Sequence, residues 1–296
     1  MARCAVISPR RDRIGLAMMF GAAFILFLLS QPQDVATAAT VPATAERPPD
    51  PAALARAAQR VQRADVLAWR RYRFRRVEKV EELTEEGSAA ETHVTDVEVT
   101  PLGDSFDERL LRLDGREPTD DEVGDVRRKG SFVKHYRTLL EGTEENGDGG
   151  YSVAALLRLS GYSYAGRETI QGVACHRLDF SASEPPADGD LSARIAAAMH
   201  GTLWLSVEGL HLVRARADSA REVGASLGLF RLRALRFAVD AAQVGPEVWL
   251  PTNVVVETRM RLVVVGVRRR RTFSYSDYAS VPAHLQAGRP LPAPGG

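Results

Sequence analysis

Hydrophobic and polar residues alternate between Gly201 and Ser219, which predicts two short strands joined at Glu208-Gly209. With a two-residue turn, five aliphatic side chains share one face of this hairpin: Leu203, Leu205, Val207, Leu210 and Leu212. The other face then carries Trp204, Val213, Ala215 and Ala217. Because a surface hairpin normally has one polar face, this pattern indicates that both sides of the sheet are at least partly covered.

Helical spacing of apolar residues is found in four other stretches of the chain. They predict helices over residues 51–65, 119–140, 151–159 and 191–200. Asp50 is suited to cap the first helix. Thr119 and Glu122 have the spacing of a capping box at the start of the second, and Gly130 is expected to interrupt it.

Most of the remaining chain has the two-residue period of strands. These strands are predicted near residues 72–81, 87–104, 162–180, 201–219, 229–239 and 247–278. Gln171 and Gly172 predict a tight turn, and the last stretch is expected to turn near Gly266. The order of elements therefore predicts an α+β protein built on one large sheet.

Two architectures explain the apolar residues on both faces of the 201–219 hairpin. One is a strongly curved antiparallel sheet with helices packed on its concave side. The other is a sandwich core in which our register is wrong by one residue, since a slip of one residue exchanges the two faces of a strand. The pattern alone leaves both open.

The N-terminal segment has the pattern of an export signal. Arginines precede an apolar run from Ile14 to Leu29, and Ala36-Thr37-Ala38 offers the small residues of a cleavage site. We therefore expect a signal peptide over residues 1–38 and export to the periplasm. The apolar run is slightly long for a signal and slightly short for a spanning helix, so an uncleaved inner-membrane anchor is the alternative.

Composition divides the rest of the chain into three parts. Residues 39–50 are rich in Pro, Ala and Thr, which predicts a linker. We expect one folded domain over residues 51–280 and a disordered tail over residues 281–296. The chain has 296 residues, of which 45% are hydrophobic, and this is enough to bury a sizeable core.

Charge and cysteine content exclude some classes of protein. The net charge of +1 gives no reason to expect nucleic acid as a partner. The run Arg268 to Arg271 makes no single basic patch, because alternate residues of a strand point to opposite faces. Once the signal is removed, Cys175 is the only cysteine, so no intramolecular disulfide is expected.

No residue pattern predicts catalysis or a metal site. None of the 6 histidines has the spacing of zinc ligands. Cys175 and His176 are neighbours in a predicted strand and point to opposite faces, which disfavours a Cys-His nucleophile pair. The carboxylates between Asp120 and Glu122 suit a helix N-terminus. We therefore expect no enzyme, no cofactor and no metal.

Several short motifs together resemble a known family. They are Gly166 and Gly172 before a strand, Leu203-Trp204-Leu205, the Glu208-Gly209 turn, Trp249-Leu250-Pro251 and the sequence YSDY. In this order they resemble the LolA-like family, which contains periplasmic lipoprotein carriers and outer-membrane lipoprotein-sorting proteins. The LDGREPTDDE stretch resembles a region shared by a group of exported bacterial proteins within this family. The resemblance implies a half-barrel whose apolar concavity, closed by helices, holds acyl chains.

A groove of this kind needs large apolar side chains along it. We expect seven residues to line it: Trp69, Phe74, Leu203, Trp204, Leu205, Phe230 and Trp249. For four aromatic residues the sequence favours packing in an ordinary core over ligand contact: Trp69, Trp204, Phe230 and Trp249.

The resulting hypothesis is non-catalytic binding of an acyl chain, lipid or lipoprotein anchor in the periplasm, in transport to the outer membrane. The alternative is a membrane-anchored envelope sensor or protein-interaction module of the same fold. Its partners would be a membrane surface or an envelope protein, and its charged faces would matter more than the groove.

Overall fold

In the computed structural model, residues 48–282 are described except 104, 130, 143–155, 158–160, 185–190, 226–229 and 263–264. The chain divides into residues 1–46 and residues 47–296, and all described residues belong to the second unit. The predicted signal peptide lies outside the described residues, as do most of the linker, the tail and the helix expected over residues 151–159.

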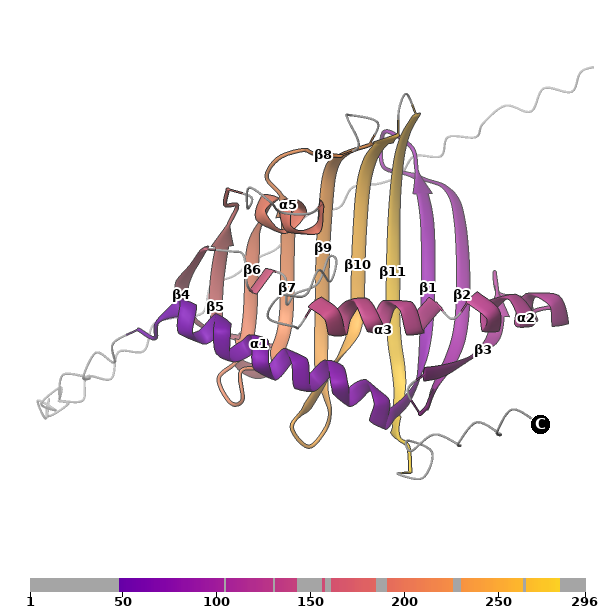
Figure 1. Ribbon diagram of the computed structural model, residues 1–296, viewed down its shortest axis with the longest axis horizontal. Helices are drawn as coiled ribbons and strands as arrows, with labels where there is room; N and C mark the ends of the chain where they lie inside the picture. Colours follow the sequence, from indigo (N-terminus) through magenta and orange to yellow (C-terminus); the bar gives the residue numbers. More distant parts are fainter. Residues whose placement is uncertain are drawn as a thin grey trace, which may run out of the picture. The chain divides into compact units, whose positions relative to one another are not determined.

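The described strands form one open antiparallel sheet (Figure 1). In chain order they are β1 (Tyr72–Leu83), β2 (Ala89–Leu102), β3 (Ser105–Leu113), β4 (Gly161–Ile170), β5 (Val173–Ser181), β6 (Met199–Ser206), β7 (Leu212–Ser219), β8 (Val223–Ala225), β9 (Phe230–Gly245), β10 (Val248–Leu262) and β11 (Val265–Ser280). Their order across the sheet is β3-β2-β1-β11-β10-β9-β7-β6-β5-β4, and β8 pairs with β9. The sheet is curved and not closed, so the predicted α+β class is confirmed.

The helices lie on one side of this sheet (Figure 1). They are α1 (Pro51–Ala68), the 3-10 turn η1 (Trp69–Arg71), α2 (Asp120–Lys129), α3 (Ser131–Gly142) and α5 (Leu191–Ala198). The Asp50 side chain accepts the Ala52 N–H at 3.0 Å, as expected of a cap. The capping box is also present, since Glu122 accepts the Thr119 N–H at 2.8 Å and Thr119 Oγ1 accepts the Glu122 N–H at 3.4 Å.

Two predicted turns can be compared directly with the structure. Gln171 and Gly172 have φ angles of 52° and 82°, which suits the two-residue turn expected between β4 and β5. The turn between β10 and β11 is earlier than predicted, because Gly266 is already paired with Arg261. It falls between Leu262 and Val265.

The β6–β7 connection differs from the two-residue turn that we expected. Leu205 pairs with Leu212, and residues 207–211 lie between the end of β6 and the start of β7. A register shift follows at once, and Leu203 pairs with Ala215. This bulge returns Ala215 and Ala217 to the face of Leu203, where the sequence pattern had placed them on the opposite face.

The core between sheet and helices consists of two clusters. The first includes Ala58 of α1, Ile195 of α5, and Leu178, Leu203 and Leu205 of the sheet. The second is rich in aromatic side chains. Its members include Trp69, Phe74, Phe106, Phe132, Tyr136 and Tyr275.

A third, smaller cluster explains why the hairpin is apolar on both faces. It contains Ile170, Cys175 and Val213, with the partly buried Trp204 and Trp249 packed against it. These residues alternate along their strands with members of the two core clusters, so they lie on the opposite face of the sheet.

One buried ion pair connects β1, β3 and α3. Arg76 Nη2 lies 2.9 Å from Glu108 Oε2, and the two side chains are 4% and 1% exposed. Glu108 Oε1 also accepts the Phe132 N–H at 2.6 Å, near the start of α3. The Arg76 guanidinium lies 5.6 Å from the centroid of the Phe132 ring. A single carboxylate therefore fixes α3 against two strands.

We expect the Glu108→Gln variant to lose about 3–5 kcal/mol of unfolding free energy, because the buried Arg76 charge would lose its counter-charge. Urea denaturation measures the change. Glu98→Gln is the matched control, since Glu98 pairs with Arg109 at 2.9 Å but the side chains are 32% and 64% exposed. It should cost less than about 1 kcal/mol. Equal losses would contradict the role given to the buried pair.

Candidate functional site

Part of the helix-facing side of the sheet is only partly buried. We call this area the floor; it consists of Phe237 of β9, Val254, Val256 and Met260 of β10, and Phe273 of β11. Val256 lies opposite Phe237 on one side and Arg271 on the other. The floor is therefore a continuous apolar surface that borders both core clusters and retains access to solvent.

His135 of α3 lies against part of the floor. Its ring stacks on Phe273, with centroids 6.2 Å apart and planes inclined by 12°. Desolvation by the surrounding protein, followed by the charges of Arg76 and Arg271, lowers the pKa of His135 to about 4.

Charged side chains border the floor on β11 and β1. Arg269 pairs with Glu82 at 2.6 Å, and Arg271 pairs with Glu78. The Arg271 guanidinium also lies 5.2 Å from the centroid of the Phe273 ring. The surface thus changes from apolar to ion-paired within one or two strands.

The arginine run divides between the two faces, as strand alternation predicts. Arg268 and Arg270 both pair with Glu257 on the side of the sheet away from the helices. The four residues therefore form no single basic patch.

The residues predicted to line a groove lie in three different places. Trp69 and Phe74 are buried in the aromatic cluster, and Leu203 and Leu205 are buried in the first cluster. The remaining tryptophans, Trp204 and Trp249, lie on the opposite face of the sheet.

Phe230 begins β9, where its backbone pairs with Ala225 and Leu262, and its side chain is outside the described residues. The floor residues were missed by sequence reasoning. The alternation of Val254, Val256 and Thr258 was the only sequence signal for these residues. It can be interpreted only when the register of β10 in the sheet is known.

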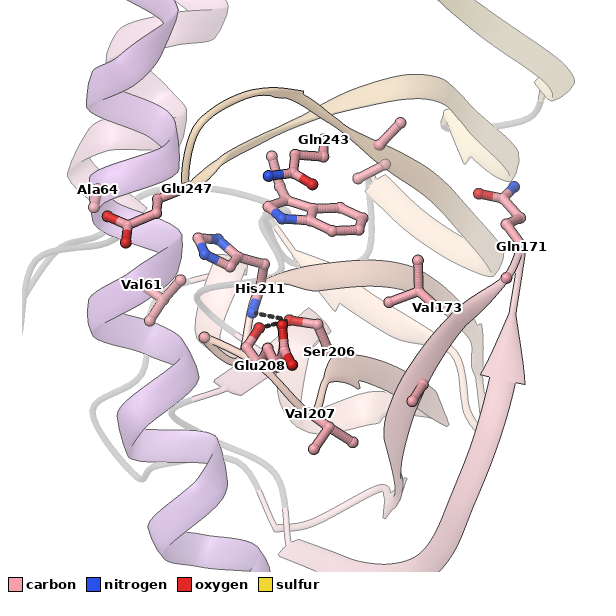
Figure 2. Close-up of a pocket in the computed structure, with 16 residues that line it drawn as sticks. Val61, Ala64, Gln171, Val173, Ser206, Val207, Glu208, His211, Gln243 and Glu247 are labelled. Atoms are coloured by element: carbon pink, nitrogen blue, oxygen red, sulfur yellow. Dashed lines mark hydrogen bonds between the residues drawn. The ribbon is translucent and has the colours of Figure 1, made fainter.

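A recess lies at the turn end of the sheet, beside α1 (Figure 2). We call it the turn pocket; its volume is about 990 Å³. The β4–β5, β6–β7 and β9–β10 turns line it together with Val61 and Ala64 of α1. Trp249 and His211 stack within it, with ring centroids 6.0 Å apart.

Asp65 attaches α1 to the strands around this pocket. The Oδ1 atom of Asp65 accepts a hydrogen bond from the backbone N–H of Trp249 at 3.1 Å, and its Oδ2 atom lies 2.8 Å from His211 Nδ1. Burial raises the pKa of the Asp65 carboxyl, and the hydrogen bonds with His211 and Trp249 oppose that shift. Sequence reasoning treated Asp65 only as the end of a helix.

The described residues offer little for metal or thiol chemistry. Among them, no group of three His, Cys, Asp or Glu side chains could hold a metal ion. Burial raises the pKa of the Cys175 thiol, which keeps it protonated, and His176 lies on the other face of β5. Within the described part of the chain, no helix is both long enough and apolar enough to cross a membrane.

Several solved structures are similar to this chain at low sequence identity. A DUF1329 family protein from Desulfovibrio piger is 12% identical, with 78% of this chain and 94% of that chain covered and a TM-score of 0.30. A structure described as an outer membrane lipoprotein-sorting protein domain from Vibrio parahaemolyticus is 11% identical, with 75% and 93% covered and a TM-score of 0.31. A LolA superfamily protein from Nitrosomonas europaea is 12% identical, with 77% and 96% covered and a TM-score of 0.29.

These similar structures include the group that the sequence motifs resemble. At such identities and TM-scores the likeness has no weight for fold, ligand or partner. No family model and no curated protein matches the chain.

The low pKa of His135 has a consequence for stability. The pKa of His135 is about 4 in the folded protein and 6.5 in an unfolded chain, so the folded protein binds fewer protons between these pH values. The stability that depends on a neutral His135 is fully present above pH 6.5 and is lost as the pH falls toward about 4. We expect a His135→Gln variant to lose less stability than the unmodified protein over that range.

Two measurements check this expectation. Urea denaturation at several pH values compares the two proteins, and an NMR titration of the imidazole signals, assigned with the variant, gives the pKa directly. A midpoint near 6.5 for His135 would show that the ring is not enclosed.

Proposed function

We propose that this protein binds an acyl chain of a lipid or lipoprotein on the floor, without catalysis. The observation that supports this proposal is the half-buried apolar surface formed by Val254, Val256 and Phe273 next to His135 of α3. A half-buried apolar surface is partly hydrated, and an acyl chain would remove that hydration. Burial contributes about 0.8 kcal/mol for each methylene group.

The border of the floor suits the chemistry of an amphiphile. Apolar side chains on β9 and β10 would contact the hydrocarbon, and Arg269 and Arg271 on β11 are each about half exposed. A polar headgroup could therefore exchange with Glu82 and Glu78 as a partner of these arginines. Only contacts and charges are needed, so the function requires no nucleophile or metal.

Access to the floor depends on the helices above it. His135 stacks on Phe273, so a chain that occupies the floor must displace or adjoin this ring. We infer that α3 moves when the ligand enters, while the Arg76–Glu108 pair at its first turn acts as the fixed end.

The same proposal includes a place of action. The export signal expected over residues 1–38 would deliver the protein to the periplasm, where acylated lipoproteins pass to the outer membrane. A retained inner-membrane anchor would instead hold the floor near the membrane surface.

The first test is whether lipid accompanies the protein. After export in a bacterial host and purification without detergent, mass spectrometry of an organic extract should find lipid in stoichiometric amount. A Val256→Asp variant places a carboxylate on the floor and should bind a fluorescent palmitate analogue at least about tenfold more weakly.

Val255→Asp is the matched control, because Val255 is the next residue on β10 and faces away from the helices. It should retain binding. If the Val256→Asp variant does not fold, Val256→Trp replaces it. The tryptophan fills the floor without adding a charge and should also reduce binding. A folded protein that carries no lipid and takes none from phospholipid vesicles would contradict the proposal.

A further inference from the structure

The turn pocket is separate from the floor, and its lining has a different chemistry. Val61 and Ala64 lie on a side of α1 that belongs to neither core cluster. Trp249 reaches it from the face of the sheet opposite the helices. A ligand in this pocket would therefore not compete with a ligand on the floor.

Two carboxylates belong to the polar part of the pocket. Glu208 lies in the β6–β7 connection and Glu247 in the β9–β10 turn, and both are exposed (Figure 2). Gln171 and Gln243 add two amide groups. Among the described residues that line the pocket there is no lysine and no arginine. The lining therefore carries two negative charges and no permanent positive charge.

The apolar part of the pocket suits the stem of a long side chain. Trp249 is partly buried in the pocket, and its stacking on His211 holds the indole in place. His211 is itself held by Asp65, so the aromatic pair is attached to both α1 and the sheet. A pocket lined by a fixed indole and two glutamates is a good environment for a planar cation.

We propose that the turn pocket binds an arginine side chain of a partner polypeptide. The guanidinium would lie between Glu208 and Glu247 and would stack on Trp249, since it combines five N–H donors with a flat face. The volume of about 990 Å³ exceeds what one side chain fills, so the neighbouring residues of the partner also fit. The alternative hypothesis of an interaction module thereby gains a specific surface.

Charge complementarity decides between this occupant and others. An acyl chain or an anionic headgroup would place Glu208 and Glu247 beside apolar or negative groups, which costs free energy. A basic peptide gains from both carboxylates. Binding should weaken as salt is raised from about 50 mM to about 500 mM, because both glutamates are exposed.

The test uses short peptides on the purified full-length protein. The probe is acetyl-Ala-Arg-Ala-amide, and the matched peptide has citrulline, which has nearly the same shape without the charge. NMR follows the indole N–H signal of Trp249, assigned with Trp249→Phe. The arginine peptide should shift this signal with saturation, and the citrulline peptide should bind at least about fivefold more weakly.

Variants then locate the effect. The double variant Glu208→Gln and Glu247→Gln should weaken the arginine peptide at least about fivefold. Glu117→Gln should leave it unchanged, since Glu117 is exposed in the loop before α2 and outside the pocket. Circular dichroism confirms that each variant is folded.

Three outcomes would overturn the proposal. Equal binding of the arginine and citrulline peptides would show that charge is not recognised. An unchanged affinity in the double variant would place the binding elsewhere. Agmatine has the guanidinium without peptide bonds, and equal binding of agmatine and the peptide would assign the pocket to a small amine rather than a polypeptide.

Discussion

The position of α1 across the strand ends determines how this open sheet is covered. The helix contacts both the edge strand β4 and the more central β10, and it packs through small side chains such as Ala55 and Ala58. Small side chains allow close approach but interdigitate little, so they do not fix the helix along its own axis. Asp65 does so, because a shift of α1 would leave a buried carboxylate without the Trp249 N–H and His211.

The floor and the turn pocket lie on different sides of this helix. On one side α1 helps to close the core, next to which the floor stays partly exposed on β9, β10 and β11. On its other side, Val61 and Ala64 form a wall of the turn pocket. One helix therefore separates an apolar surface bordered by arginines from a pocket bordered by glutamates.

Local chemistry made the elements predictable, and long-range pairing made the sites unpredictable. Helix and strand boundaries that depend on neighbouring residues alone can be predicted from the sequence. Examples are the cap at Asp50, the capping box of Thr119 and Glu122, and the turn at Gln171-Gly172. The bulge after Leu205 depends on pairing with β7, and it changes which residues face the helices. For the same reason the predicted groove residues divide among three clusters, because burial does not distinguish a packed core from a ligand surface.

The pairing of β1 with β11 sets the time at which this fold can form. These are the first and last strands of the domain, yet they are neighbours inside the sheet, and Tyr72 lies opposite Ser280. The Val281 N–H also donates to the Arg71 carbonyl at 2.7 Å. The β1–β3 meander cannot join the rest of the sheet until the last strand is available, so folding waits for nearly the whole chain. The complete sheet therefore forms only after synthesis of the chain is nearly finished.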